Sequence, residues 1–576
     1  MPEPLSALIE ERSLLLRQVA ELGDFQPGSI SSPTRKCGKP SCHCARPDDS
    51  GHGPHYQLTQ KVDGKTVTQS LPSVAALRKA ENEIAEYRRF RSLADDLVGV
   101  NRKICHLRPV EQTGQTDQEK KTAQTIQQEV AREVEQLLRV VFRDRKTTGR
   151  LDLESVETAI RAAMHQAGAT ALTQLLQFEQ PDAEHLMVPC VCGHTARFKE
   201  LRSKTFLSVV GAVEVRRPYY LCSHCSKGQH PVDGELGVDG LESSPGVRRM
   251  EAVVGSEMPF APACEPMKVL AGLEVPAKAI ERAAESIGAA IARSDEREID
   301  RAKQLVLPIV SRQNIPKMYV LMDGVQIPVV AAETAGRIGR VEGQRARTRE
   351  CKLGAVFTQT TVDQDGWPIR DPDSTSYVGA VETADAFGYR IYTEAWRRGW
   401  EWATTKIVIG DGAVWIWNLA DQHFPGAVQI VDLYHARQHL WDIAALLYPH
   451  DAAAKKRWMA PLKDLLDHGR TELLVEWLRE IAAEHSRTQP GLAEEISQQA
   501  DYFETNTHRM QYPEFREQGF FVGSGVIEAG CKSIVGVRLK QSGMFWTVRG
   551  ANAIIALRCC RFNHRFEDFW AETRAA

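Results

Sequence analysis

The sequence has no apolar run that approaches the roughly 18 residues needed for a membrane-spanning helix. Its first residues, MPEPLSALIEE, form an acidic amphipathic start without the basic and apolar regions of a signal peptide. A strong net charge is also absent: the formal value is −3, which neither favours nor excludes nucleic acid as a partner. We therefore expect a protein of the cytoplasm that has no membrane partner.

An export signal is missing, so the 13 cysteines are not expected to form disulfides, and most of them fall in short-spaced groups. Cys190-Val-Cys192 and Cys222-Ser-His-Cys225 flank the β-rich segment FLSVVGAVEVRRPYYL, which is the plan of a zinc ribbon. Four thiolates would close a tetrahedral shell, so this zinc would be structural. The first pair has one intervening residue instead of two. Alternative ligands are therefore His194 and His224.

A second cysteine group lies near the N-terminus in CGKPSCHC and contains Cys37, Cys42 and Cys44. The spacing suits zinc, and three nearby histidines are candidates for the fourth ligand. The alternative is a glycine- and proline-rich loop with buried or reactive thiols. The candidate histidines are His43, His52 and His55.

Hydrophobic periodicity predicts amphipathic helices at 5–22, 73–100 and 118–143, with a polar linker at 109–118. Two further helices, one ending at Gly272 and one with Pro276 in its first turn, fit a helix-turn-helix or any other helical hairpin. After Lys317, three strands are followed by strand and helix units, which indicates a mixed sheet flanked by helices. Residues 440–515 are helical in pattern, and we interpret them as an insertion.

Two acids are predicted at strand ends, each followed by glycine: Asp323 in VLMDG and Asp411 in IVIGDG. Such an acid is held by the sheet yet accessible, although most Asp-Gly pairs after a strand are simply turns. A third acid, Glu528 in SGVIEAG, follows the predicted N-cap Ser524 and has small neighbours that allow close approach, whereas most helix glutamates are only solvated.

Three converging carboxylates repel one another unless cations neutralise them, so this cluster predicts divalent metal. Two Mg²⁺ or Mn²⁺ ions per active site would clamp a phosphodiester for in-line displacement. In this hypothesis Asp323 bridges both ions, Asp411 completes the shell of one, and Glu528 completes the shell of the other. The nucleophile is water in cleavage and a DNA 3′-hydroxyl in joining.

The order of the motifs DG, GDGAVWI, VDLYHA, VGSGVIEAGCK and RLKQSGMFW resembles Kra-type bacterial insertion-sequence transposases over roughly 185–565. That resemblance implies an Asp-Asp-Glu site on a ribonuclease H-like domain, in a nucleoid-associated bacterial protein. Asp432 and His435 form D-x-x-H, similar to a signature of Mutator-like and hAT-like relatives, and a supporting role is expected. His435 can equally be structural, and Asp432 can replace Asp411 as a ligand.

The partner expected from this chemistry is double-stranded DNA, both terminal inverted repeats and target. Two ends must be paired before joining, so we expect a homodimer or a higher oligomer. The basic stretch 337–352 and the acid-free segment from Cys531 to Phe566 are candidates for phosphate contacts, with solvated surface as the alternative. The predicted DNA-binding residues are Arg345, Arg347, Arg349, Lys532, Arg538 and Lys540.

A chain of 576 residues is too long for one core, and the expected fold class is multidomain α/β with helical parts. Alternative functions are a structure-specific nuclease or resolvase on the same fold, and a catalytically inactive zinc-dependent DNA-binding regulator. The expected segments are an N-terminal helical region with a Cys-rich loop at 1–108, linker and helices at 109–180, a zinc ribbon at 181–236, a helix-turn-helix-like domain at 237–312, the first part of a ribonuclease H-like mixed-sheet catalytic domain at 313–439, an all-helical insertion at 440–518, and final helices with Glu528 at 519–576.

Overall fold

The computed structural model of the protein describes residues 5–62, 65–107, 117–148, 152–307, 310, 314–339 and 345–575. Chain contacts divide the molecule into two compact units, Met1–Lys121 and Thr122–Ala576. Most of the predicted linker at 109–118 lies outside the described residues. Across the described residues, every helix is too short or too polar to cross a membrane.

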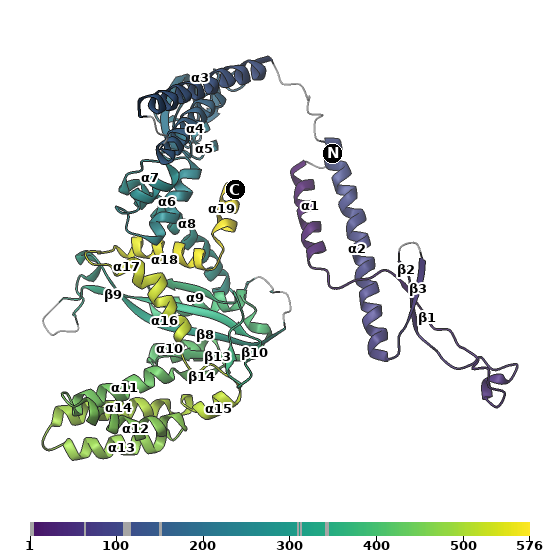
Figure 1. Cartoon of the computed structure of the whole chain (residues 1–576), viewed down its shortest axis with the longest axis vertical. Coiled ribbons are helices and arrows are strands. Elements are labelled where there is room, and N and C mark those ends of the chain that lie inside the picture. Colours follow the sequence, from purple (N-terminus) through teal and green to yellow (C-terminus); the bar gives the residue numbers. More distant parts are fainter. Residues whose placement is uncertain are drawn as a thin grey trace. The chain divides into compact units, whose positions relative to one another are not determined.

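The first unit combines a helical pair with a small sheet (Figure 1). The two helices pack together through the apolar residues Leu8, Val100 and Ile104. The three strands pair antiparallel in the order β1-β2-β3, and the sequence patterns did not predict them. The elements are α1 (Leu5–Ala20), β1 (Ser29–Ser31), the 3-10 turn η1 (His43–Ala45), β2 (Gln57–Val62), β3 (Lys65–Ser70) and α2 (Val74–Leu107).

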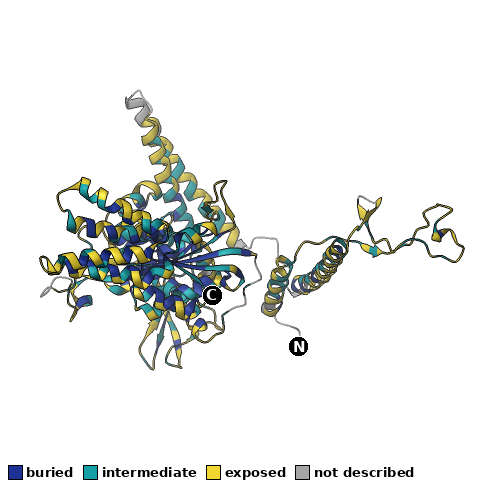
Figure 2. Cartoon of the chain, turned by 90° about the horizontal axis from the view of Figure 1, so that it is seen from below, coloured by how far each residue is buried: buried dark blue, intermediate teal, exposed yellow. Residues whose placement is uncertain are grey.

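The described side chains of α3 (Asp117–Thr148) are all partly or fully exposed (Figure 2). After this helix, a long antiparallel hairpin packs against α4 (Leu153–Leu175). The hairpin core contains Phe206, Val213 and Val215. Its four-stranded sheet has the order β4-β5-β6-β7. These strands and the helix that follows are β4 (Met187–Pro189), β5 (Thr195–Ser208), β6 (Gly211–Cys222), β7 (Gly228–Gln229) and α5 (Pro231–Glu235).

Three helices follow: α6 (Pro245–Glu257), α7 (Cys264–Ala271) and α8 (Ala277–Lys303). As predicted, α7 ends at Gly272, whose φ of 69° lies in the left-handed region. The expectation for Pro276 was wrong by one position, because this residue is the N-cap of α8 and has extended backbone. Helices α6 and α8 pack closely, since a Cβ at Gly255 would lie 2.9 Å from Ile280.

A mixed five-stranded sheet in the order β12-β9-β8-β13-β14 forms the centre of the second unit, as predicted. Strands β12, β9 and β8 are antiparallel neighbours, and β13 runs parallel to both β8 and β14. A short pair, β10 (Thr361–Val362) and β11 (Pro368–Ile369), follows β9. The strands of the sheet are β8 (Ile315–Pro328), β9 (Thr348–Gln359), β12 (Ser376–Ala380), β13 (Ala403–Gly410) and β14 (Val428–Val431).

Helices cover both faces of this sheet (Figure 1). Consecutive strand residues point to opposite faces, and a Cβ at Gly354 would meet Ile391 and Phe387 of α9 (Ala384–Arg397). Its neighbour Leu353 points the other way and contacts Gly530 at the end of α16 (Gly525–Gly530). Helix α10 (Val414–His423) packs beside α9, and α18 (Val548–Phe562) packs on the edge strand β12.

The predicted helical insertion lies between β14 and α16 and joins the same hydrophobic core. After α16 the chain continues through the π-helix η5 (Cys531–Gly536), α17 (Val537–Leu539), α18 and α19 (Phe566–Ala575). The remaining 3-10 turns are η2 (Ala331–Thr334), η3 (Trp400–Trp402) and η4 (Thr507–Arg509). The insertion contains α11 (Leu433–Leu447), α12 (Ala452–Asp467), α13 (Thr471–His485), α14 (Pro490–Asn506) and α15 (Tyr512–Glu517).

Candidate active site and metal-binding clusters

Asp323 and Asp411 occupy equivalent positions on neighbouring parallel strands. Leu321 of β8 pairs with Ile409 of β13, and each aspartate follows two residues later. Because side chains alternate along a strand and neighbouring strands lie about 4.8 Å apart, the two carboxylates project side by side from one face. Asp323 pairs with Leu353, so this is the face that α16 covers. Asp411 directly follows β13 as predicted, whereas the prediction that Asp323 ends its strand was wrong, because β8 continues to Pro328.

The Asp323 carboxyl group is held in place by two donors. Its Oδ1 accepts a hydrogen bond from the Gly324 amide at 2.6 Å, and its Oδ2 accepts one from the Cys531 thiol at 3.3 Å. Burial raises the pKa of Asp323, the Asp411 charge raises it further, and His435 opposes this change. A bound cation would favour the ionised form of this carboxyl group.

The loop that carries Asp411 is clamped by the helical insertion. Asp411 Oδ1 accepts from the Ala413 amide at 2.9 Å, and its carbonyl oxygen accepts from the Tyr502 hydroxyl of α14 at 2.9 Å. Gly412 has φ of 97°, and a Cβ there would lie 2.5 Å from the Tyr502 ring. Glycine therefore allows both the turn and the close approach of Tyr502. On the other side, Tyr502 stacks on His439 with ring centroids 4.1 Å apart.

Glu528 lies exposed on α16. Ser524 occupies the N-cap position as predicted, but its hydroxyl does not cap a backbone amide; it donates to Glu528 Oε1 at 3.0 Å. Cys531 follows Glu528 by three residues and donates to Asp323. Burial raises the pKa of the Cys531 thiol, and the charges of Asp323 and Glu528 raise it further. Cys531 therefore lies in the electrostatic field of both acids.

The three carboxylates are neighbours without forming a closed ligand set. Their oxygen atoms do not all lie within 4.8 Å of one another. Like charges repel at such distances when no cation lies between them. The residues thus fit a divalent ion by donor type, because carboxylate oxygens are hard ligands that suit Mg²⁺ or Mn²⁺. Closer approach of the three carboxylates to one another would complete the set.

The π-helix η5 begins at Cys531, one turn after Glu528. Arg558 of α18 stabilises it, since its guanidinium donates to the carbonyl oxygens of Ser533 at 2.6 Å and Ile534 at 2.9 Å. Single π-helical turns occur frequently at functional sites. Here the wide turn lets Cys531 reach Asp323 while Ile534 and the rest of the segment pack into the core.

Asp432 is fully buried, and both of its carboxylate oxygens are occupied. Oδ1 accepts from the His435 amide at 2.9 Å and caps α11, while Oδ2 accepts from the Ser524 amide at 2.5 Å. Asp432 therefore ties α11 to the segment that precedes Glu528. This arrangement favours a structural role over metal ligation in place of Asp411. The His435 ring is exposed and lies 4.9 Å from the ring of His439.

A basic groove of about 720 Å³ lies on the β8–β9 hairpin and reaches Glu382 and Thr383, which precede α9. Lys352, which lines the groove, pairs with Gly324, so its side chain points to the face of the sheet opposite that of Asp323. Arg345 and Arg347 are exposed along the groove, and Arg349 is half-buried and donates to the Glu333 carbonyl oxygen at 3.2 Å. Lys532 and Lys540 are exposed after α16. These five predicted DNA contacts remain accessible.

The prediction that Arg538 contacts DNA was wrong. Its guanidinium is fully buried, stacks on Phe260 and Trp546, and donates to the Gly255 carbonyl oxygen at 3.0 Å. Burial lowers its pKa to about 10. Other cations in the acid-free segment are also engaged within the protein: Arg558 and Arg561 bond to Glu257. This segment therefore has fewer cations available to bind phosphates than its composition indicated.

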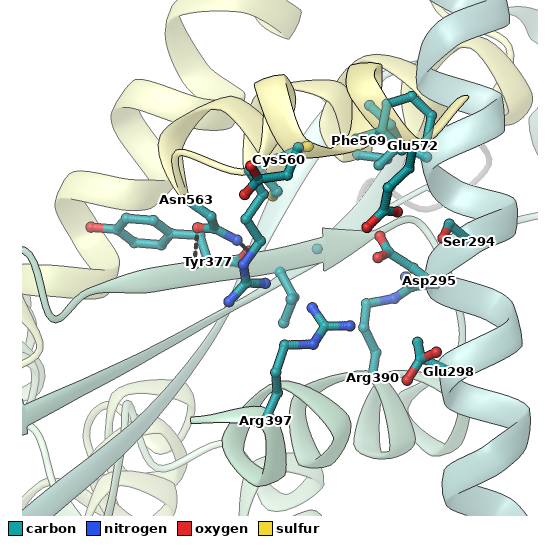
Figure 3. Close-up of a pocket in the computed structure, with 17 residues that line it drawn as sticks. Ser294, Asp295, Glu298, Tyr377, Arg390, Arg397, Cys560, Asn563, Phe569 and Glu572 are labelled. Atoms are coloured by element: carbon teal, nitrogen blue, oxygen red, sulfur yellow. Dashed lines mark hydrogen bonds between the residues drawn. The ribbon is translucent and has the colours of Figure 1, made fainter. Parts of the chain in front are cut away.

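A separate cavity of about 410 Å³ lies at the β12 edge of the sheet, away from Asp323 and Asp411 (Figure 3). Arg390 bonds to Glu382, and Arg397 and Arg565 bond to the buried Glu394. Asp295 of α8 faces this group and interacts electrostatically with all three arginines. Three further acids, Glu298, Asp568 and Glu572, also line the cavity, and we interpret it as part of an ionic network that joins α8 to the sheet.

The four predicted zinc-ribbon cysteines converge. The sulfur atoms of Cys190, Cys192, Cys222 and Cys225 all lie within 4.8 Å of one another, which suits a tetrahedral metal ion such as zinc. The closest pairs are Cys190–Cys225 at 3.6 Å and Cys192–Cys222 at 3.7 Å. Backbone hydrogen bonding at Cys225 lowers the pKa of Cys222 to about 6, which favours the thiolate that a metal needs. The set is complete without a histidine.

The N-terminal cysteines converge as well, and the structure identifies the fourth ligand. Cys37, Cys42, Cys44 and His52 form one cluster in which the ligand atoms lie within 4.8 Å of one another. Cys42 Sγ lies 3.0 Å from His52 Nε2, and Cys37 Sγ lies 3.5 Å from Cys44 Sγ. Of the other candidates, His43 bonds to Asp49 and His55 is outside the cluster. This set can hold a metal such as zinc.

Comparison with known families informs only the first unit. A family described as "Domain of unknown function (DUF6788)" matches residues 5–80, which include the Cys3His cluster. No curated protein matches the chain.

Proposed function

We propose that this protein is a DNA transposase of the Kra type, with an Asp-Asp-Glu site on a ribonuclease H-like domain. The observation that carries the proposal is the register of β8 and β13, which sets Asp323 level with Asp411 on one face of a mixed sheet. A helix with a third acid, Glu528, packs on that same face and is bonded to Asp323 through Cys531. Helices on both faces and an all-helical insertion before Glu528 agree with the fold that the resemblance implies.

The residues divide into ligands and supports. Asp323 interacts with Asp411 and accepts a hydrogen bond from Cys531, three residues after Glu528, so it is the candidate for a shared ligand, with Asp411 and Glu528 each serving one ion. Two Mg²⁺ or Mn²⁺ ions would activate the attacking hydroxyl group and stabilise the leaving oxygen. Cys531 and the Gly324 amide orient Asp323, and Tyr502 fixes the Asp411 loop. The exposed arginines of the groove would hold the DNA phosphates.

In this proposal the substrates are double-stranded terminal inverted repeats and a target DNA. A homodimer or higher oligomer would pair the two ends, and the protein would work in the bacterial cytoplasm at the nucleoid. The basic groove on the β8–β9 hairpin supports a DNA substrate, because a phosphodiester backbone is bound mainly by Lys and Arg.

The proposal is tested with the full chain, Mg²⁺ and duplexes that end in the inverted repeats flanking its gene. We expect cleavage and strand transfer that fall at least about a thousandfold, or about 4 kcal/mol, in Asp323→Asn, Asp411→Asn and Glu528→Gln. Glu401→Gln is the matched control, since Glu401 is exposed near the opposite end of β13. Cleavage that persists in all three variants contradicts the assignment.

The same experiment separates the alternatives. Cleavage without joined products identifies a structure-specific nuclease or resolvase on the same scaffold. Specific DNA binding with no cleavage in Mg²⁺ or Mn²⁺ identifies a zinc-dependent regulator. The carboxylate oxygens of the three acids do not all lie within 4.8 Å of one another, and this observation is the reason for testing the regulator.

The position of the DNA is tested by salt dependence. Arg347→Gln should lower the slope of log affinity against log salt by about 1, because one phosphate contact is lost. Arg538→Gln should leave the slope unchanged and lower stability, since Arg538 is buried. Equal slopes for Arg347→Gln and the unmodified protein would show that the groove does not bind the DNA.

A further inference from the structure

Two exposed histidines lie beside the four-cysteine cluster and are not needed by it. His194 and His224 stack with ring centroids 3.7 Å apart and an interplanar angle of 11°. His194 follows Cys192 by two residues in the first knuckle, and His224 lies between the two cysteines of the second. The turn at Cys190–Cys192 and the turn at Cys222–Cys225 therefore each place one imidazole on the same exposed side.

The local backbone explains this placement. Gly193 has φ of 84°, and its amide donates to the Cys190 carbonyl oxygen at 2.9 Å, so the chain turns sharply after Cys192. The turn closes when the Cys190 amide donates to the His194 carbonyl oxygen at 2.7 Å. His194 is thereby directed back toward Cys192, whose sulfur lies 3.6 Å from His194 Nδ1.

Cys192 belongs to two ligand sets at once. Its sulfur lies 3.7 Å from Cys222 Sγ within the four-cysteine cluster. The ligand atoms of Cys192, His194 and His224 form a second group whose members also lie within 4.8 Å of one another. A tetrahedral ion bound by four thiolates has no vacancy for an imidazole, so the two histidines are available to a different ion.

We infer that the ribbon binds a second divalent cation of the zinc class on its exposed face, held by His194, His224 and a bridging Cys192 thiolate. Four thiolates around one divalent ion leave two negative charges, and a second cation beside Cys192 neutralises them. Imidazole nitrogen and thiolate sulfur are the donors that such borderline cations prefer. The stacked rings must tilt apart to share one ion, and their exposure leaves them room to do so.

Three protein ligands leave one tetrahedral position open, unlike the closed four-cysteine shell. The second ion is therefore exchangeable and accessible to an external ligand. This inference is independent of the proposed transposase activity, because it concerns only the ribbon.

The test uses the full chain loaded with zinc and then washed with a weak chelator that leaves closed sites filled. Co²⁺ is added as the probe, and bound equivalents are counted by elemental analysis alongside the visible absorption of thiolate-bound cobalt. We expect one more equivalent for the unmodified protein than for His194→Ala/His224→Ala, with the same number of tightly held zinc ions in both. His185→Ala is the control, because His185 is an exposed histidine just before β4.

A single, more conservative substitution distinguishes loss of the second ion from loss of the fold. His224→Gln removes an exposed ring that makes no hydrogen bond in the described structure. It should weaken binding of the extra Co²⁺ at least about a hundredfold, since loss of an outer-shell partner alone costs about 10- to 100-fold. Equal Co²⁺ binding by all forms overturns the inference. Loss of a tightly held zinc ion in His224→Gln also overturns it, because the histidine would then support the structural site.

Discussion

The cysteine ribbon and the carboxylate site were both predicted as metal centres, yet only the ribbon is assembled in the structure. The four thiols of Cys190, Cys192, Cys222 and Cys225 lie within 4.8 Å of one another, whereas Asp323, Asp411 and Glu528 do not. Thiols can be neutral and bond to one another, but ionised carboxylates repel until a cation separates them. The ribbon is also built by one hairpin, while the acids depend on contacts between distant segments.

The comparison predicts that loss of its metal ion unfolds the ribbon, whereas the sheet around the carboxylates stays folded without metal. The largest effect is expected for Cys222→Ser, because structural zinc contributes about 10–16 kcal/mol to small zinc folds. This variant should lose one zinc ion, and peptides from 187–229 should lose protection in hydrogen exchange. The sheet peptides around Asp323 should stay protected.

Cys264→Ser is the control for this variant, since Cys264 lies on α7 outside either cluster. If ribbon peptides remain protected in Cys222→Ser, the ribbon is held by packing alone and the contrast with the carboxylate site disappears.

The next effect concerns the scaffold of the carboxylate site. Asp432→Ala should lower the free energy of unfolding by about 3 kcal/mol, because it removes a helix cap and leaves the Ser524 amide without its acceptor. Urea denaturation measures the change. Asp451→Ala, at the exposed cap of α12, should cost about 1 kcal/mol. Equal losses would show that the buried link to Ser524 contributes nothing.

A smaller effect is expected at the clamp from the insertion. Tyr502→Phe should cost about 1 kcal/mol in stability and should lower the cleavage rate about tenfold, because the Asp411 loop loses its hydrogen bond. Tyr512→Phe is the matched variant, since its hydroxyl donates to the Val431 carbonyl oxygen and not to that loop. Equal cleavage rates in the two variants would show that Tyr502 does not position Asp411.

The smallest effect concerns charge at Asp323. Burial raises its folded pKa above the unfolded value, so ionisation destabilises the metal-free fold, and this cost appears as pH rises through the folded pKa. Asp323→Asn should therefore raise the metal-free Tm at pH 7.5 by about 1–2 °C, with a smaller difference at low pH. Mg²⁺ should raise the Tm of the unmodified protein alone. A Tm that falls in Asp323→Asn would contradict this electrostatic account.

Local sequence patterns predicted much of the fold, whereas the metal-binding role of the three acids stays a prediction. Periodicity located the long helices and the sheet strands, and cysteine spacing located both thiol clusters. The position of Asp323 within its strand was missed, because β9 pairs with β8 as far as Pro328 and extends it beyond the Asp-Gly pair. Antiparallel pairing of this kind depends on a partner outside the local pattern.

The supports of the site could not be predicted for a related reason. Cys531 reaches an acid 208 residues away, and Tyr502 reaches a carbonyl 91 residues away. Neither residue carries a local signal, although the three-residue spacing of Glu528 and Cys531 is compatible with one helix face. Burial of Arg538 was also hidden, since composition does not reveal aromatic partners such as Phe260 and Trp546.

The π-helical turn at Cys531–Gly536 restricts insertions and deletions of residues in this segment. Each residue of an α-helix advances the chain by about 100° around the axis. Deleting one residue here to restore an α-helical turn would rotate everything downstream by that amount. Arg538 would turn away from Gly255, or Glu528 would turn away from the sheet. Substitutions are therefore far better tolerated in this segment than changes in its length.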